Sequence, residues 1–308
     1  MASTQVNTYF AKGIREGLTN TVADLFADDC PLMAMAEKIQ ATNVYHEWQT
    51  DALASAVKTG VVQGADISYS QPATRTRVGN YTHIRLRNWD VTFTQMAVTV
   101  AGVKDQVARE VMKALKALTT DYESIFLNTV AKTAGTTSHA TRAGGLQKSV
   151  ITNTAVGSAA KTTATFALTE DVANLVMQKI WTAGGDPKAL FCGGYEKRVI
   201  SKRFTAKTGF TFTMEQSTRQ AIANINKYEG SFGTLDIIPD RFHMKKRVSI
   251  ITPDQIKIAV LRDIEQYKGA PTASSIKGWC EAEMTLQYGN EKAHGKIKNL
   301  RTGGAIPA

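Results

Sequence analysis

Three groups of basic side chains are the first candidates for chemistry in this chain of 308 residues. The chain carries 37 Lys and Arg against 27 Asp and Glu, which gives a formal charge of +10. That excess favours contact with a polyanion, although net charge indicates partners and solubility rather than fold. The candidates are Arg75, Arg77, Arg85 and Arg87, then Lys197, Arg198, Lys202 and Arg203, and finally Lys245, Lys246 and Arg247.

The four arginines of the first group alternate with other residues in predicted strands. A planar guanidinium group binds a carboxylate through two parallel hydrogen bonds, so this row suits an acidic surface on a neighbouring chain. The other two groups lie on a predicted helix and in a predicted loop, where we expect them to face DNA or an interface. In a nucleic-acid-binding protein, such groups would cluster on one face together with aromatic side chains that stack on bases. Because the three groups are spread over three segments, a solvated basic surface is the first interpretation, followed by contact with a neighbouring acidic chain and then by direct phosphate contact.

Motifs for catalysis or metal binding are weak or absent. The segment from Gly144 to Ser149 contains Lys-Ser but lacks the glycine that a phosphate-binding loop requires before its lysine. Neither a dinucleotide fingerprint nor a Gly-x-Ser-x-Gly motif is present, and no two of the five histidines stand four residues apart as helix-borne metal ligands. We interpret Asp28-Asp29 as a solvated acidic pair. The absence of such motifs is weak evidence against an enzyme, because many active sites leave no local sequence pattern, and a hydrolase with an unrecognised site is one alternative.

The cysteines and the hydropathy pattern point to a reducing compartment without membrane contact. Cys30, Cys192 and Cys280 are odd in number and form no CxxC or Cys–His spacing, which argues against a zinc site and a disulfide framework. The sequence contains no apolar run of signal-peptide length and no stretch of 18 apolar residues. We therefore expect neither export by a signal peptide nor a membrane partner.

A long amphipathic helix is the element that must organise the rest of the chain. Apolar residues recur at steps of three and four from Val103 to Val130, and neither Pro nor Gly interrupts them. This spacing predicts a helix from Val103 to Ala131, roughly 43 Å long at 1.5 Å per residue. Such a helix needs a sheet or other helices along its whole face, so we interpret it as a spine.

An extended ribbon is predicted before this helix. Apolar and polar residues alternate around Trp48 and again after Pro72, with a polar tract from Thr59 to Gln71 between them. The apolar parity changes at Asn88 and again before Met96, which predicts bulges in a second strand that continues to the spine helix. Because a two-stranded ribbon is marginal in water, we expect a second subunit to cover it, with Trp48 among the contacts.

The remaining sequence predicts a connector, a second α/β unit and a closing hairpin. Residues 132–165 have the composition of a loop, and Thr169 then begins a helix that ends at Gly184-Gly185. Glu281 to Lys298 alternates about a turn at Gly289-Asn290, which predicts a hairpin packed on the spine helix. The fold class is α+β. Short strands are predicted at Ala189–Cys192, Ala221–Tyr228, Thr234–Ile238, Val248–Ile251 and Ile256–Leu261.

Several segments, and the order of the elements, resemble tailed-bacteriophage major capsid proteins with the Hong Kong 97-type fold. No single segment decides the matter, and the combination carries the resemblance. The segments are Cys30-Pro31-Leu32, Tyr45 to Ala54, Val98 to Gly102, Lys113 to Lys116, Glu283 to Asn290, and His294-Gly295.

The resemblance implies an α+β, Hong Kong 97-like capsid fold in five parts. These are an N-terminal arm (1–40), an extended β-ribbon loop (41–97), a peripheral domain with the spine helix (98–164), an axial domain (165–250), and a return to the peripheral domain (251–308). The chain would be a structural protein, not an enzyme, with no cofactor. Many copies would form pentamers and hexamers that close an icosahedral shell around phage DNA.

The resemblance also implies a set of partners and a location. The partners would be other copies of the chain, non-specific packaged DNA, a portal and, because the predicted arm is short, a separate scaffolding protein. A decoration protein is a further candidate. The chain would reside in the virion after assembly in the host cytoplasm. On charge alone, the alternative function is a monomeric basic nucleic-acid-binding protein.

Overall fold

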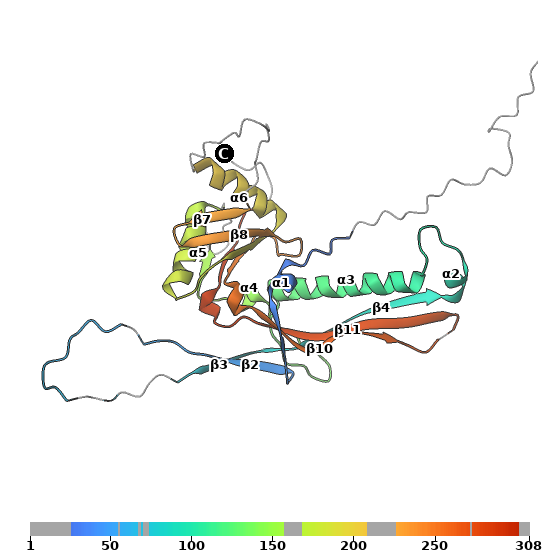
Figure 1. Cartoon of the computed structure of the whole chain (residues 1–308), viewed down its shortest axis with the longest axis horizontal. Helices are drawn as coiled ribbons and strands as arrows, with labels where there is room; N and C mark the ends of the chain where they lie inside the picture. The colour runs from blue at the N-terminus through green and yellow to red at the C-terminus, as the bar shows by residue number, and fades with distance from the viewer. Residues whose placement is uncertain are drawn as a thin grey trace, which may run out of the picture.

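A long helix lying along a sheet dominates the structure (Figure 1). The computed structural model describes residues 26–54, 56–66, 69, 74–156, 168–207, 226–271 and 273–301, with no side-chain description for 203–207. Within these ranges the chain forms a four-stranded sheet, a six-stranded sheet and a two-stranded ribbon. The predicted α+β class is confirmed.

The spine helix is α3 (Gln106–Leu127), which is shorter than predicted at both ends. Its 22 residues span about 33 Å. The Asp105 carboxylate accepts hydrogen bonds from the amides of Val107 and Ala108 and so satisfies two free donors of the first turn. Val103, which continues the apolar spacing, lies in the loop before this cap. Periodicity alone therefore placed the start of the helix too early.

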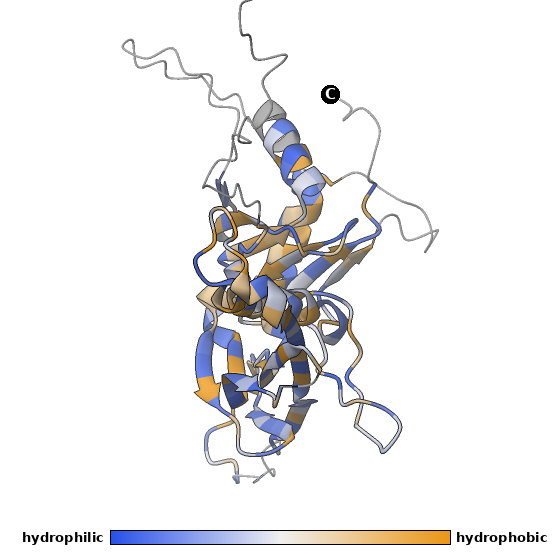
Figure 2. Cartoon of the chain, turned by 90° about the vertical axis from the view of Figure 1, so that its right-hand side faces the viewer, coloured by the Kyte–Doolittle hydropathy of each residue, from blue (hydrophilic) through white to orange (hydrophobic). Residues whose placement is uncertain are grey.

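The sheet beneath α3 has the strand order β1-β10-β11-β4. Strand β1 (Glu37–Gln40) is parallel to β10 (Lys257–Lys268), and β11 (Ser275–Gln287) runs antiparallel to both β10 and β4 (His83–Thr92). Figure 2 shows strands in which hydrophilic and hydrophobic residues alternate, as a sheet with one covered face requires.

The first core forms where the helix stripe meets this sheet. Leu118, Tyr122 and Phe126 of α3 are fully buried, and Trp89 and Met284 contribute from the sheet. The Tyr122 hydroxyl lies 2.9 Å from the carbonyl oxygen of His83 and 2.6 Å from that of Ala282. One helix residue therefore contacts the backbone of both β4 and β11.

Strand β4 is continuous, which contradicts the predicted bulge at Asn88. Its register with β11 is unbroken, from His83 opposite Met284 to Thr92 opposite Ser275. The apolar side chains Ile84 and Leu86 lie on the outer face, where they are 49% and 51% exposed. The prediction assumed that apolar side chains always point inward, and β4 reverses that rule in its first half.

The chain beyond β4 also differs from the prediction. It forms a short helix, α2 (Phe93–Ala97), in place of a continued strand, and the Thr92 hydroxyl accepts a hydrogen bond from the amide of Gln95 at its start. Near the C-terminus, β11 and β12 (Gly295–Lys298) belong to different sheets. The prediction that they form a closing hairpin is therefore wrong. Gly289, with φ of +53°, turns the chain away from the first sheet.

The six-stranded sheet carries the second core. Helix α5 (Glu170–Thr182) and helix α6 (Gly194–Lys207) accompany it. The predicted strands Ala189–Cys192 and Val248–Ile251 and the helix start after Thr169 are confirmed. In sheet order the strands are β5 (Thr154–Val156), β12, β9 (Val248–Ile251), β6 (Ala189–Cys192), β8 (Gly233–Pro239) and β7 (Lys227–Gly230).

Two strands of this sheet come from outside residues 165–250. Strand β5 falls within 98–164 and β12 within 251–308, so both join the six-stranded sheet from ranges assigned to the peripheral domain. The division into peripheral and axial domains stays a prediction. Most of the predicted strand Ala221–Tyr228 lies outside the described residues, and β7 begins at Lys227.

The ribbon is present but short. Strand β2 (Tyr45–Thr50) pairs with β3 (Thr76–Tyr81) over six residue pairs, and the chain between them projects from one end of the molecule (Figure 1). The ribbon is shorter than predicted because β4 joins the four-stranded sheet. Of the tract from Thr59 to Gln71, residues 67, 68, 70 and 71 lie outside the described residues.

The remaining elements are single turns. They are α1 (Pro31–Met35), α4 (Leu146–Ser149), and the 3-10 turns η1 (Pro253–Gln255) and η2 (Glu291–Ala293). Helix α1 lies in the predicted arm (1–40), of which residues 1–25 lie outside the described residues. Helix α4 and β5 lie in the stretch predicted to be a loop, so that connector is partly structured.

The helix-to-sheet core yields a stability prediction. Replacing the fully buried Leu118 by alanine leaves a cavity against the sheet, and we expect the free energy of unfolding to fall by about 2–5 kcal/mol. Met112 on the same helix is 59% exposed, and Met112→Ala should change it by no more than about 0.5 kcal/mol. Urea unfolding of the unassembled chain measures both. Equal losses in the two variants would contradict the observed orientation of α3.

Candidate functional site

The base of the ribbon is fixed to the body by buried polar side chains. Asn80 is 1% exposed, and its side-chain amide donates hydrogen bonds to the carbonyl oxygens of Gly144 (3.0 Å) and Leu286 (2.9 Å). Its side-chain oxygen accepts one from the amide of Gly144 at 2.7 Å, and the hydroxyl of Thr82 donates to Glu283 at 2.6 Å. A buried polar group left unpaired costs about 1–3 kcal/mol, so these bonds favour one direction of the ribbon.

Trp48 contributes to the same attachment. It is 9% exposed, its indole N–H donates to the carbonyl oxygen of Gly289 at 2.7 Å, and its ring meets that of Tyr288 edge-on at 5.0 Å between centroids. Trp48 therefore packs mainly within its own chain. The predicted contact with a second subunit stays a prediction.

The loop beyond the ribbon strands exposes apolar side chains that the sequence analysis missed. Leu53 is 99% exposed, and Val57, Val61 and Val62 are 80–85% exposed. Exposed apolar residues are ordinary when scattered singly, but four on one projecting loop indicate a surface that another molecule covers. The Gly, Ser and Thr content of this segment led us to predict a polar tip, so these side chains received no weight.

Arg75 and Arg77 lie on the ribbon as predicted. Arg77 pairs with Glu47 across the two strands at 2.5 Å, and Arg75 pairs with Asp51 at 3.4 Å. Both arginine side chains are 68% exposed, and exposed ion pairs contribute at most about 1 kcal/mol. Both guanidinium groups therefore remain open to carboxylates of a neighbouring chain, and that role stays a prediction.

Arg85 and Arg87 are not on the ribbon, which corrects their predicted position. They lie on β4 and face α3, where both bind Asp121. Arg87 does so through two hydrogen bonds of 2.7 and 2.6 Å, and Arg85 through one of 2.8 Å. The carboxylate they bind therefore belongs to their own chain. Their side chains are 41% and 42% exposed, so a further contact with a second subunit stays a prediction.

The basic residues predicted on a helix do lie on α6. Lys197 is half-buried and donates to the side-chain oxygen of Asn226 at 3.2 Å, and burial lowers the pKa of Lys197. Arg198 and Lys202 are exposed. Arg203 belongs to the same helix, but its side chain lies outside the described part of the chain. Lys197 therefore has a structural partner, and the DNA-facing or interface role of this cluster stays a prediction.

The loop after β8 holds the third basic cluster. Lys245 and Lys246 are exposed and Arg247 is half-buried, directly before β9. The amide of Lys246 donates to the buried carboxylate of Glu196 at 2.9 Å. This bond fixes the loop against α6. The role predicted for these residues, facing DNA or an interface with another subunit, also stays a prediction.

The end of the arm is fastened to the spine helix through Glu123. This carboxylate is fully buried and accepts hydrogen bonds from the amides of Leu32 (2.7 Å) and Met33 (2.9 Å). These amides belong to the first turn of α1, where the N-cap residue Cys30 provides no side-chain hydrogen bond. Glu123 therefore caps α1 from another element.

Flanking ion pairs hold the same segment. Asp28 pairs with Lys116 of α3 at 2.6 Å, and Asp29 pairs with Arg241 at 3.7 Å. The two aspartates thus each have a basic partner within the chain, whereas the sequence suggested a solvated acidic pair. All four side chains are at least 38% exposed, so these pairs position the segment more than they stabilise it.

Asp240, at the end of β8, lies beside Glu123. It is 3% exposed; one carboxylate oxygen accepts a hydrogen bond from the amide of Phe242 at 2.7 Å, and the other has no hydrogen-bond partner among the described residues. Burial raises the pKa of both carboxyl groups, that of Glu123 to about 7. Because two like charges in one buried site disfavour each other, the pair holds a proton that an exposed pair would release.

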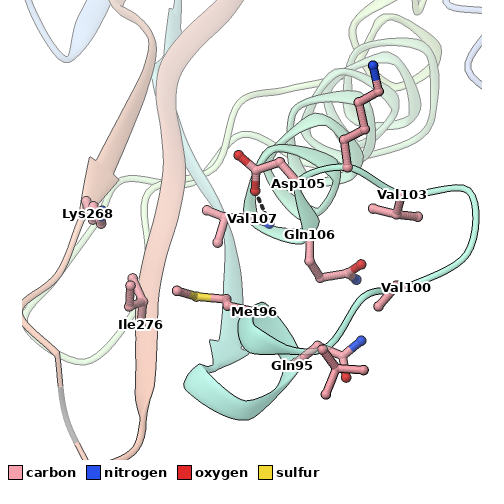
Figure 3. Close-up of a pocket in the computed structure, with 11 residues that line it drawn as sticks. Gln95, Met96, Val100, Val103, Asp105, Gln106, Val107, Lys268 and Ile276 are labelled. Carbon is pink, nitrogen blue, oxygen red and sulfur yellow. Dashed lines mark hydrogen bonds between the residues drawn. The ribbon is translucent and has the colours of Figure 1, made fainter.

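A cavity of about 460 Å³ opens at the far end of the molecule, beside the N-terminus of α3 (Figure 3). Its lining mixes apolar residues, among them Met96, Val103 and Ile276, with polar residues such as Lys268. The carboxylate in the lining of this cavity belongs to Asp105, which already caps α3. Within the described residues no group of three His, Cys, Asp or Glu side chains could hold a metal ion, and no helix is long and apolar enough to cross a membrane.

Comparison with known proteins identifies the family. Residues 2–301 match the family model described as SU10 major capsid protein. The chain belongs to the SU10 major capsid protein family. The predicted resemblance to phage major capsid proteins, and the function of a structural capsid protein, are thereby confirmed. No curated protein matches the chain.

Solved structures share the fold of this capsid protein at low sequence identity. The cyanophage A-1(L) capsid asymmetric unit is 12% identical with a TM-score of 0.72, covering 93% of this chain and 97% of that one. The Mycobacterium phage Adephagia structure is 12% identical with a TM-score of 0.62, covering 94% and 96%. The SrpI encapsulin complex from Synechococcus elongatus is 10% identical with a TM-score of 0.59, covering 92% of each chain.

The buried acid pair gives the capsid protein a predicted pH dependence. An unfolded glutamate ionises near its ordinary pKa of 4.5, whereas folded Glu123 does so near 7. The stability that its proton contributes is complete below pH 4.5 and is lost as pH rises to about 7. In Glu123→Gln this loss should shrink by on the order of 3 kcal/mol, because the group no longer titrates.

Urea unfolding of the unassembled chain between pH 4.5 and 8 measures this effect. Glu110→Gln is the matched control, since Glu110 lies on the same helix and pairs with Lys113 near the surface. The control should keep the pH profile of the unsubstituted chain. A Glu123→Gln profile as steep as that of the control would contradict the assigned protonation.

Proposed function

We propose that this capsid protein self-assembles through pentamers and hexamers into an icosahedral shell that encloses phage DNA. The projecting ribbon loop carries the proposal. This loop lies at one end of the molecule and leaves Leu53, Val57, Val61 and Val62 at least 80% exposed. The other described elements pack into two hydrophobic cores. Covering one such side chain contributes about 1.5–3 kcal/mol, so a second copy that covers all four would gain substantially.

The geometry of the ribbon supports a contact between different surfaces of two copies. The loop lies at one end of an elongated chain, and α2 lies at the opposite end (Figure 1). A projection that contacts a different surface on the next copy forms a heterologous interface, which closes into a ring when the rotation permits. Rings of five and six copies can then tile a closed shell.

Further partners follow from the family. We propose a separate scaffolding protein, a portal and a decoration protein as partners, and non-specific packaged DNA as the content of the shell. The chain would assemble in the host cytoplasm and remain in the virion. It would act without catalysis or a cofactor. The alternative of a monomeric basic nucleic-acid-binding protein has only the net charge in its favour, whereas the family match supports the shell.

Substituting the loop tests the proposal. We expect the purified chain to form shells visible by negative-stain electron microscopy. Replacing Leu53, Val57, Val61 and Val62 by serine should reduce shell formation at least tenfold, because the contact between copies loses its apolar area. The fold should be unaffected, since these side chains contact little of their own chain. Urea unfolding should therefore differ by no more than about 0.5 kcal/mol.

A conservative variant supplies the control for this experiment. Leu53→Met with Val57→Ile, Val61→Ile and Val62→Ile retains the apolar surface and should retain the shells. The proposal would be abandoned if the unsubstituted chain stayed monomeric under all conditions, or if the serine variant assembled as well as the isoleucine variant.

A further inference from the structure

Four basic residues from three separate segments converge around β12. We name them the basic patch: Lys148 of α4, Arg247 directly before β9, and Lys296 and Lys298 of β12. The sequence analysis singled out only Arg247. Lys296 and Lys298 share one face of their strand, since side chains two apart point the same way and Ile297 between them is buried.

Backbone pairing and one hydrogen bond bring the four together. Strand β12 is antiparallel to β9 with Ile297 opposite Val248, so the residue after Ile297 lies beside the residue before Val248. Lys298 is therefore adjacent to Arg247. The Lys296 ammonium donates to the carbonyl oxygen of Gln147 at 2.7 Å, next to Lys148.

The lowered pKa of Lys296 also indicates that the other three basic residues lie close to it. Burial, and then the charges of Lys298, Arg247 and Lys148, lower its pKa to about 8. Glu291 is the acidic group that acts in the opposite direction. Its carboxylate, however, already accepts hydrogen bonds from the amides of Ile151 (2.7 Å) and Thr152 (3.2 Å).

No ion pair with a described residue neutralises the basic patch. Arg85 and Arg87, by contrast, have Asp121, and Arg75 and Arg77 have acidic partners on the ribbon. Four cations held together, with no ion-pair partner among the described residues, repel one another, and an anion that binds them relieves that repulsion.

We propose that the basic patch binds the phosphate backbone of double-stranded DNA and therefore lies on the inner face of the shell. The inference rests on the proposed function and specifies which surface contacts the packaged DNA. Three of the four residues are lysines, whose mobile point charges suit contacts that do not depend on sequence. Docking to a protein carboxylate more often uses an arginine fork, as between Arg87 and Asp121. Lys245 and Lys246 extend the basic patch along its loop.

Salt-dependent DNA binding tests the proposal. The patch variant replaces Lys148, Arg247 and Lys298 by alanine, and affinity for a 30-base-pair duplex is measured by fluorescence anisotropy over a range of salt concentrations. Each lost phosphate contact reduces the slope of log affinity against log salt by about 0.9, so three should reduce it by about 2 to 3. Affinity at 0.1 M salt should fall at least ~10-fold.

A control variant separates the basic patch from net charge. Replacing Lys104, Lys188 and Lys257 by alanine removes three positive charges elsewhere, and it should weaken binding less than ~3-fold. Equal weakening in both variants would overturn the proposal. So would intact DNA binding combined with loss of shells in the patch variant, because the basic patch would then contact an acidic protein surface.

Electron microscopy of the same preparations keeps the two ideas distinguishable. Shells that form from the patch variant but retain less DNA than shells of the control support both the shell and the basic patch. If even the unsubstituted chain forms no shells, the proposed function fails. A patch-specific loss of DNA binding would then still assign the phosphate contact to these residues.

Proton uptake tests the proposal in the unsubstituted chain, independently of any folding defect. A bound phosphate raises the pKa of Lys296, so binding at pH 8 should take up as much as about half a proton per chain. Calorimetry in two buffers of different ionisation enthalpy measures this uptake. Lys296→Arg keeps the charge but does not titrate, so it should retain affinity within about 3-fold and lose the uptake. Proton uptake that persists in Lys296→Arg would show that another group titrates on binding. That result would overturn the proposed contact between Lys296 and DNA phosphate.

Discussion

The described structure depends on one buried seam, where α3 lies along the inner face of the four-stranded sheet. Three consecutive helix residues fasten three different parts of the chain to this seam. Asp121 binds the two arginines of β4, Tyr122 reaches the backbones of β4 and β11, and Glu123 caps the arm at α1. Successive residues on a helix point about 100° apart, so one turn can serve three neighbours.

The same turn also connects the two cores. Glu123 belongs to the first core region, whereas Asp240 follows a strand of the six-stranded sheet. The proton that this pair holds makes the junction between arm, spine and second sheet sensitive to pH. Release of that proton as pH rises to about 7 leaves like charges in one buried site, which lowers the stability of the junction. The junction is therefore a place where the arrangement of the parts can respond to conditions while both cores stay packed.

The projecting ribbon loop follows the opposite principle. Hydrogen bonds of Asn80 and Trp48 fix its base, yet its described aliphatic side chains are 80–99% exposed and so have little contact with their own chain. A single chain therefore contains a firm platform and a surface that is satisfied only by another molecule. That division suits a protein that functions as one of many subunits of a shell, and the basic patch is the surface that we propose for the packaged DNA.

The sequence by itself determined the elements whose signal is local. Apolar spacing located α3, the cap at Thr169 located the start of α5, and continuous apolar runs located β6 and β9. The short segments from Cys30 to Gly295 sufficed to indicate the capsid family. It was composition and charge spacing, likewise, that drew attention to Arg247.

Only the tertiary structure decided which strands pair and which charges meet. Strand β4 points two arginines inward because Asp121 lies above them, and no local pattern contains that partner. Strands β11 and β12 alternate like a hairpin, yet they enter different sheets because each pairs with other strands, β11 with β4 and β10, and β12 with β5 and β9. Lys148 and Lys296 likewise carry no signal alone, since electrostatic interaction depends on distance in space and not on separation along the chain.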